Sequence, residues 1–292
     1  MRKKRKLAVP VLFLMPAIIL LAVFIVYPTI QTIYLSFYSW KGIANVPKLF
    51  VGLKNYENVL TNQGFWDSLK NCMYFLVGGF IILMPLSFIL ALIITSKMKF
   101  TKIMKTAYFM PVMLGVTAVA LMWVYMLNPS WGVFAQILSW LGLEEWVQDW
   151  LATPTVNIWC VVLVNEWMYA GYNMLIFASG IVAIPSSLYE AAEIDGCSGL
   201  KKIWYVTIPL CKNSFKVFSI ICITGCIKVF DIIWAMTRGG PNGVSESPGI
   251  LLYYEAFQYK LYGKSSATGV IMIVLGIVLS LVVNRALKQE EL

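Results

Sequence analysis

The sequence predicts an all-α membrane protein with six transmembrane helices. Of its 292 residues, 60% are hydrophobic and 13% are charged, and a soluble chain of this length needs far more polar surface. Apolar segments of about 20 residues or more, the length that crosses a bilayer, recur without an alternating strand pattern, which favours helices. The expected spans, each good to about three residues at its ends, are 8–36, 72–96, 106–127, 156–182, 212–236 and 266–284.

The first span follows a basic run at residues 2–6, RKKRK. The apolar stretch after it is longer than the core of a secretory signal, and no small-residue cleavage site follows, so we expect a retained helix. A basic run is also found in nuclear and nucleic-acid-binding addresses. In front of a membrane span it is typical of a topology signal.

The distribution of basic residues predicts that both termini are cytoplasmic. With that orientation, 15 of the 23 Lys and Arg residues lie in cytoplasmic segments, 7 lie outside, and Lys228 lies within a span. An excess of basic residues marks the cytoplasmic side. Because this signal accounts for most of the net charge of +9, the charge does not indicate a nucleic-acid partner.

The whole chain, residues 1–292, is expected to be one multi-pass domain in the plasma membrane, in contact with membrane lipid. The outer loops, near 37–71, 128–155 and 237–265, contain Trp, Tyr and Pro, which suits short lids at the membrane interface. The phosphate-binding pattern GxxxxGK[ST] is absent from the sequence, so we expect no ATP site in this chain.

Catalytic and metal chemistry are poorly supported. The sequence has no histidine, which excludes imidazole ligands and His-based acid–base catalysis. Its six cysteines form no CxxC pair and are interpreted as reduced packing thiols. Cys222 and Cys226 share a helix face but have no His beside them for a metal site. We therefore expect a transport protein rather than an enzyme, with no catalytic residue, no metal and no cofactor.

Polar residues form a stripe on the fourth span. At 100° per residue they fall within about 120° of arc, and such a stripe faces the protein interior or a water-filled cavity rather than lipid. Aromatic rings pack on the C–H face of a sugar, and amides and carboxylates bond its hydroxyls. The stripe consists of Asn165, Glu166, Tyr169, Tyr172 and Asn173.

Residues 186–210 are too polar to span a bilayer and too apolar for a simple linker. Ser187 stands three residues before Glu190, the spacing of a capping box, so we expect a short helix that ends at Gly196 in a left-handed turn. A second short helix is expected near 199–207. The result is a helix–turn–helix on the cytoplasmic face, and the alternative is an amphipathic loop lying on lipid headgroups.

The fifth span carries a second stripe, formed by Thr224, Lys228 and Asp231 within about 60° of arc. Lys228 and Asp231 are three residues apart on the expected helix, so the favoured interpretation is a self-neutralised structural pair. The functional alternative is that Lys228 attracts an acidic substrate or pairs with Glu166.

Several segments of the sequence resemble those of a known family. The residues Glu190-Ala191-Ala192, Gly196 and Ile208-Pro209-Leu210 resemble the EAA motif of ABC importer permeases. The segment FDIIWAMTRGGP, residues 230–241, and the segment 163–196 are similar to the sugar branch, in particular the larger-type permease subunit of maltose, glycerol-phosphate and multiple-sugar importers. The resemblance covers about residues 8–287.

The resemblance implies a type I ABC importer permease fold and a partnership with other proteins. The 186–210 segment is then the coupling loop that docks on a cytoplasmic ATPase. The implied partners are a second homologous permease, two ATP-binding subunits and an extracellular solute-binding protein. The implied coupling residues are Glu190, Ala191, Ala192, Asp195 and Gly196.

The resemblance also implies positions for a transmembrane sugar site. Asn165 and Tyr172 keep the residue types of the maltose-type subunit, whereas the other positions depart from them. The alternative is that the stripe packs against the partner permease. The implied substrate positions, with Lys228 added for its charge, are Asn165, Glu166, Met168, Tyr169, Tyr172, Cys222, Cys226 and Lys228.

Three functions follow in order of preference. The first is the permease of an ABC importer for a sugar or oligosaccharide. The second is an ABC permease for an acidic saccharide or a glycerol phosphate, which the charged residues Glu166, Lys228 and Asp231 support. The third is an ATP-independent channel or secondary transporter, which usually shows inverted repeats or broken helices with ion sites, and the sequence shows neither.

Overall fold

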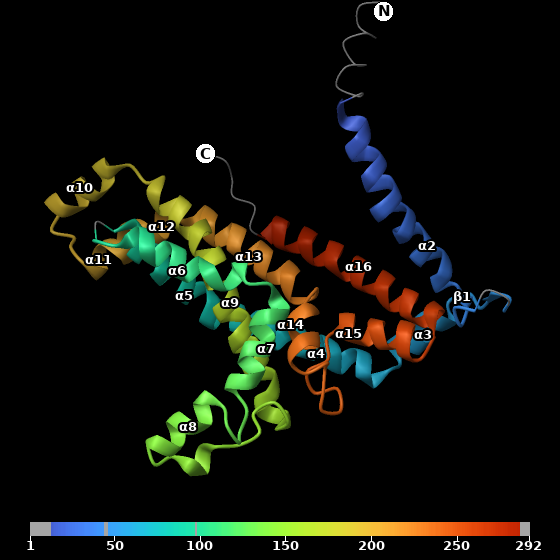
Figure 1. Cartoon of the computed structure of the whole chain (residues 1–292). Coiled ribbons are helices and arrows are strands. Elements are labelled where there is room, and N and C mark those ends of the chain that lie inside the picture. Colours follow the sequence, from blue (N-terminus) through green and yellow to red (C-terminus); the bar gives the residue numbers. More distant parts are fainter. Residues whose placement is uncertain (1–12, 44–45, 97, 287–292) are drawn as a thin grey trace, which may run out of the picture. The chain divides into compact units, whose positions relative to one another are not determined.

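The structure is a computed structural model that describes residues 13–43, 46–96 and 98–286 (Figure 1). The basic run at 2–6 and the beginning of the first expected span, 8–12, lie outside these residues. The described part is mainly helical. It separates into two compact units, Met1–Phe65 with Leu251–Val274, and Trp66–Ile250 with Leu275–Leu292.

Three helices are long and apolar enough to cross a membrane singly: Phe13–Ser36, Gln63–Thr95 and Tyr262–Arg285. Three bent pairs pass the same test together, which gives up to six spans in the described residues. The pairs are Thr101–Met113 with Val116–Met126, Pro154–Val182 with Ser186–Ile194, and Leu200–Leu210 with Lys212–Cys226. The expected all-α membrane fold is confirmed.

The first unit begins with the helix Phe13–Ser36, which contains a π-helical turn, η1 (Ala22–Val26), and α2 (Tyr27–Ser36). Two short antiparallel strands follow, β1 (Tyr38–Ser39) and β2 (Leu49–Phe50), and then α3 (Lys54–Leu60). The amide of Asn55 donates hydrogen bonds to the carbonyl oxygens of Ser36 at 2.8 Å and Tyr38 at 3.0 Å. This side chain therefore fixes α3 to the end of the first helix.

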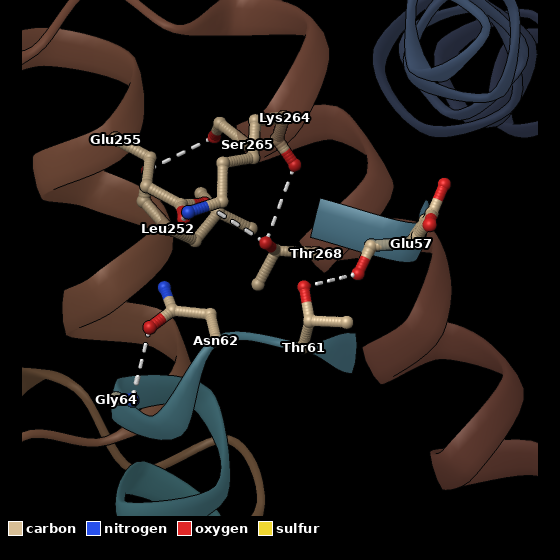
Figure 2. Close-up of polar contacts among 9 residues, drawn as sticks. All are labelled: Glu57, Thr61, Asn62, Gly64, Leu252, Glu255, Lys264, Ser265 and Thr268. Carbon is tan, nitrogen blue, oxygen red and sulfur yellow. Dashed lines mark hydrogen bonds and ion pairs between the residues drawn. The ribbon is translucent and has the colours of Figure 1, made fainter. Parts of the chain in front are cut away.

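The later part of this unit contains the end of α15 (Pro248–Tyr253), the π-helical turn η5 (Tyr254–Gln258) and the first turns of α16 (Tyr262–Ala286). Glu255 is buried here and faces α16 (Figure 2). Its carboxylate forms an ion pair with Lys264 Nζ at 3.0 Å and accepts a hydrogen bond from Thr268 Oγ1 at 2.8 Å. These contacts fix η5 to the beginning of α16.

The second unit begins within one long helix, Gln63–Thr95, made of α4 (Gln63–Gly78), the π-helical turn η2 (Gly79–Leu83) and α5 (Met84–Thr95). The short helices α6 (Thr101–Met113) and α7 (Val116–Met126) follow. A surface segment with α8 (Val133–Trp140) and the 3₁₀ turn η3 (Glu144–Trp146) leads to α9 (Pro154–Val182).

The rest of the second unit comprises α10 (Ser186–Ile194), the continuous helical stretch of α11 (Leu200–Lys202), η4 (Ile203–Thr207) and α12 (Ile208–Leu210), then α13 (Lys212–Cys226) and α14 (Asp231–Met236). The α10–α11 turn and α8 lie at opposite ends of α9 (Figure 1).

The core of the second unit is the face where α9 meets α5, α6 and α13. Phe177 of α9 packs on Phe88 at 5.6 Å, Phe215 at 4.9 Å and Phe218 at 5.5 Å, measured between ring centroids. Gly171 is needed here because a Cβ at this position would overlap the carbonyl oxygen of Tyr108 on α6. Aromatic burial and close backbone approach together hold α9 as the central helix of this unit.

Two expected spans are broken. Residues 106–127 were expected to be a single helix, but α6 and α7 meet at 94°. The helix breaks here because Pro111 removes a backbone donor near the end of α6. In addition, Gly115 precedes α7 in a non-helical conformation. The expected span 212–236 was also wrong as a continuous helix, since α13 ends at Cys226 and α14 begins at Asp231.

Candidate functional site

A cavity of about 250 Å³ lies within the second unit. Its walls come from the middle of α9, the end of α13, the non-helical residues 227–230 and the beginning of α14, with side chains added from α4, η2 and α7. All of these segments belong to the same compact unit. The cavity therefore gathers residues as far apart in the sequence as Phe75 and Ile232.

All but one of the predicted substrate positions line this cavity. Met168 is the exception, because its side chain is 2% exposed and is buried in the core of the unit, so we leave it out of the candidate site. The lining positions are Asn165, Glu166, Tyr169, Tyr172, Cys222, Cys226 and Lys228.

The cavity has further lining residues that the sequence did not assign to a substrate site. Asp231 was assigned to a structural pair, and Asn173 was only a member of the polar stripe. Phe75, Leu83 and Val116 line the cavity from three other elements. Their apolar side chains look like ordinary span residues, so no sequence signal distinguishes them from lipid-facing ones.

Glu166 is the strongest polar feature of the cavity. The residue is 2% exposed, and its Oε1 accepts a hydrogen bond from Asn165 Nδ2 at 3.3 Å. Its Oε2 has no hydrogen-bond partner among the described residues. A buried carboxylate oxygen without a donor is unfavourable. The site is therefore suited to a ligand that presents a hydroxyl or N–H group to this oxygen.

Two glycines provide the close packing behind Glu166. A Cβ at Gly78 would overlap the side chain of Val162 on α9, and a Cβ at Gly79 would overlap the sulfur of Cys222 on α13. Both thiols predicted for the site, Cys222 and Cys226, line the cavity, and Cys226 Sγ donates to the carbonyl oxygen of Ile223 at 3.1 Å. Both cysteines are free, so neither forms a disulfide.

The favoured pairing of Lys228 with Asp231 is wrong. Of the ion pairs within 4.0 Å among the described residues, none involves Lys228, either with Asp231 or with Glu166. The spacing of three residues brings two side chains together only on a continuous helix. Here the helix stops at Cys226, and both charged side chains are exposed at the cavity.

The 186–210 segment forms the expected helix–turn–helix. Gly196 has φ +75°, the left-handed conformation that was predicted. Lys202 bonds Glu193 as an ion pair, and the hydroxyls of Tyr189 and Thr207 are hydrogen-bonded at 3.2 Å. These two links hold α10 against the α11–η4 stretch.

The beginning of α10 corrects the capping prediction. Ser187 lies inside the helix, Pro185 is the N-cap residue, and no side chain caps the first turn. A proline with φ −58° leads the chain into the helix without a capping hydroxyl. The outer surface of the segment carries the predicted Glu190, Ala191 and Asp195, together with large exposed apolar side chains at Ile194, Leu200, Trp204 and Tyr205.

The GGP segment forms a tightly bonded loop at the Pro154 end of α9. Asn157 of α9 donates to the carbonyl oxygen of Gly240 at 3.0 Å, and Asn71 of α4 donates to that of Glu246 at 2.8 Å. Within the loop, the hydroxyls of Thr237 and Ser245 are bonded at 2.9 Å. The loop thus fixes α14, which carries Asp231, to α4 and α9.

Comparison with known proteins gives one family. The family model described as "Binding-protein-dependent transport system inner membrane component" matches residues 80–289. A probable ABC transporter permease protein of Pyrococcus horikoshii is 32% identical over 96% of each chain. The trehalose/maltose transport system permease protein of Thermococcus litoralis is also 32% identical, over 94% of this chain and 91% of the relative.

A similar fold occurs in a solved structure of a bacterial alginate ABC transporter in complex with an alginate pentasaccharide-bound periplasmic protein. One of its chains matches with a TM-score of 0.85 at 22% identity, over 97% of this chain and 95% of the other. This likeness confirms the expected permease fold. The relatives confirm the resemblance drawn from the EAA and GGP segments.

Proposed function

Because the chain belongs to the family of binding-protein-dependent transport system inner membrane components, we propose that it carries a sugar or oligosaccharide through the cavity between α9 and α13. Its relatives are multi-pass ABC transporter permeases rather than enzymes, and this chain is a permease of the same kind. The trehalose/maltose relative favours a saccharide substrate.

The observation that carries the proposal is the composition of the cavity. Glu166 offers a carboxylate oxygen that has no donor, Asn165 offers an amide, and Tyr169 and Tyr172 offer aromatic faces. A sugar presents hydroxyls to the first two groups and C–H faces to the rings. The cavity of about 250 Å³ is a small site, so we propose that a second, homologous permease encloses the other side of the substrate.

The 186–210 segment is proposed to transmit ATP binding to the cavity. Its exposed apolar side chains, small residues at Ala191 and Ala192, and acidic groups at Glu190 and Asp195 form a surface suited to another protein. We propose that two cytoplasmic ATPase subunits dock on the permease pair and bias it between inward-facing and outward-facing states. An extracellular solute-binding protein would deliver the substrate, as the periplasmic protein in the alginate complex suggests.

An anionic saccharide is the second candidate. Lys228 lines the cavity without a carboxylate within 4.0 Å, so its ammonium group is available to an acidic substrate. Against this, Glu166 and Asp231 bring two carboxylates to the same cavity.

The variant Lys228→Met distinguishes the two candidate substrates. It should abolish uptake of an anionic saccharide and leave uptake of a neutral one nearly unchanged.

Asn165→Ala and Tyr172→Ala should each lower uptake without disturbing assembly with the ATPase. Tyr172→Ala removes an aromatic face that packs on the sugar, and Asn165→Ala removes a hydrogen-bonding amide. The loss of one hydrogen bond to a neutral sugar costs about 0.5–1.5 kcal/mol, or roughly threefold to tenfold in affinity. The measurement is saccharide uptake and ATP hydrolysis by the complete complex in proteoliposomes. The matched controls are Asn58→Ala and Tyr259→Ala, both exposed and outside the cavity lining. Unchanged uptake in both cavity variants would identify the α9 stripe as a packing face.

Labelling of single cysteines should show the orientation. With both termini cytoplasmic, a cysteine at Ser198 in the 186–210 segment is inside, and one at Asn242 in the GGP loop is outside. In a cysteine-free variant in sealed cells, a membrane-impermeant maleimide should therefore react only at position 242. External labelling at position 198 would overturn the orientation.

A further inference from the structure

The surface segment 127–153 carries an apolar side that neither the cavity nor the 186–210 segment uses. On α8, Val133, Ile137 and Trp140 fall on one stripe at 100° per residue, and Trp140 is 85% exposed. Leu141 continues the stripe, and Trp146 is exposed after it. A continuous apolar surface of this kind marks an interaction site.

The opposite side of α8 is already occupied. Ala135 is buried, and the ring of Phe134 stacks on Trp123 of α7 at 5.7 Å and 18°. The orientation of α8 about its own axis is therefore fixed by this packing. The exposed stripe therefore faces the medium that surrounds the neighbouring parts of α7 and α9.

The depth of α8 follows from the same aromatic cluster. Trp123 also contacts Trp167 of α9, with ring centroids 5.4 Å apart. Trp167 lies about 22 Å along the helix from Val182, at 1.5 Å per residue. Val182 is the last residue of α9, and only residues 183–185 separate it from the polar 186–210 segment. The hydrocarbon core is about 30 Å thick. The first turn of α8 thus lies within the thickness of the bilayer, close to the boundary opposite the 186–210 segment.

The composition of the segment fits this depth. Residues 127–153 include Trp131, Trp140, Trp146 and Trp150 and contain no Lys or Arg. Tryptophan prefers the membrane–water boundary, where its ring is in the apolar region and its N–H reaches water or headgroups. Without basic residues, the attraction is apolar rather than an attraction to anionic lipids.

We infer that α8 is an interfacial helix whose Val133–Ile137–Trp140 stripe lies in the lipid of the leaflet opposite the 186–210 segment. The segment is then a lipid anchor that fixes the joined ends of α7 and α9. Because α7 supplies Val116 and α9 supplies Asn165 and Glu166 to the cavity, the anchor holds two of its walls at a constant height in the membrane. This inference does not depend on which solute is transported.

Spin labels test the inference in the full chain. In a cysteine-free variant reconstituted into phosphatidylcholine nanodiscs, nitroxides are attached at Ile137→Cys and Trp140→Cys. Ser139→Cys, at an exposed position of α8 outside the stripe, and Glu145→Cys, also exposed, are the matched controls. Collision rates are measured with oxygen, which enters lipid, and with a water-soluble nickel chelate. The ratio of oxygen to nickel collisions should be several-fold higher at 137 and 140 than at 139 and 145.

Three outcomes would overturn the inference. Equal ratios at all four positions would place the stripe in water. Low collision rates with both reagents at 137 and 140 would mean that protein covers the stripe. If nickel collisions at positions 137 and 140 disappear when the solute-binding protein is added, the stripe binds that protein instead of lipid.

Discussion

Lys264→Met should lower the free energy of unfolding by about 3–5 kcal/mol, the range found when one partner of a buried ion pair is removed. The partner, Glu255, has a side chain that is 3% exposed, and its carboxylate lies 3.0 Å from Lys264 Nζ. With the ammonium group gone, Thr268 remains as a hydrogen-bond donor at 2.8 Å (Figure 2). One neutral donor cannot replace the charge, so a carboxylate is left buried and uncompensated. Thermal or denaturant unfolding of the purified chain in detergent measures the loss.

Two further variants give this prediction its controls. Lys260→Met removes an exposed lysine that lies just before α16, and its effect should stay within about 0.5 kcal/mol. The double variant Glu255→Met with Lys264→Met removes both charges and should recover most of the stability, because an apolar pair of similar volume often replaces a buried ion pair without loss. Thr268 keeps its bond to the carbonyl oxygen of Lys264 at 3.2 Å in that variant. A Lys264→Met variant as stable as Lys260→Met would contradict the prediction.

Glu190→Lys and Gly196→Leu should reduce saccharide uptake to background while the chain still inserts into the membrane. Glu190 is exposed on α10, so reversing its charge leaves the fold of the chain intact and acts on the proposed ATPase surface. Gly196 has φ +75° with open space around a Cβ, so leucine there would meet no neighbour and would cost about 1–2 kcal/mol of backbone strain. That strain changes the turn between α10 and α11.

The readout for these two variants is uptake in cells together with the amount of ATPase that copurifies with the chain. Glu57→Lys is the matched control, since Glu57 is an exposed carboxylate on a short helix outside the 186–210 segment. It should leave both quantities unchanged. Normal uptake and normal ATPase copurification in both coupling variants would remove the 186–210 segment from the coupling role.

Local sequence patterns were enough to predict a long apolar helix and one of the turns. The expected span 156–182 matches α9, Pro154–Val182, to within two residues at one end, because a long apolar segment in lipid must satisfy its backbone hydrogen bonds as a helix. Gly196 was predicted to be left-handed because glycine adopts that conformation without a steric penalty, and its φ is +75°. Both properties are local, so the residues concerned contain the necessary information.

Packing between helices, by contrast, decides which of the predicted site residues come together. Met168 and Tyr169 are adjacent in the chain, but the packing of neighbouring helices on α9 buries the first and leaves the second at the cavity. Lys228 and Asp231 separate because α13 ends at Cys226 and α14 packs on α7 instead of continuing the helix. Val116 reaches the cavity from α7, which no helical periodicity connects to α9. Contacts of this kind depend on how distant segments fill space together, and hydropathy along the chain does not record that.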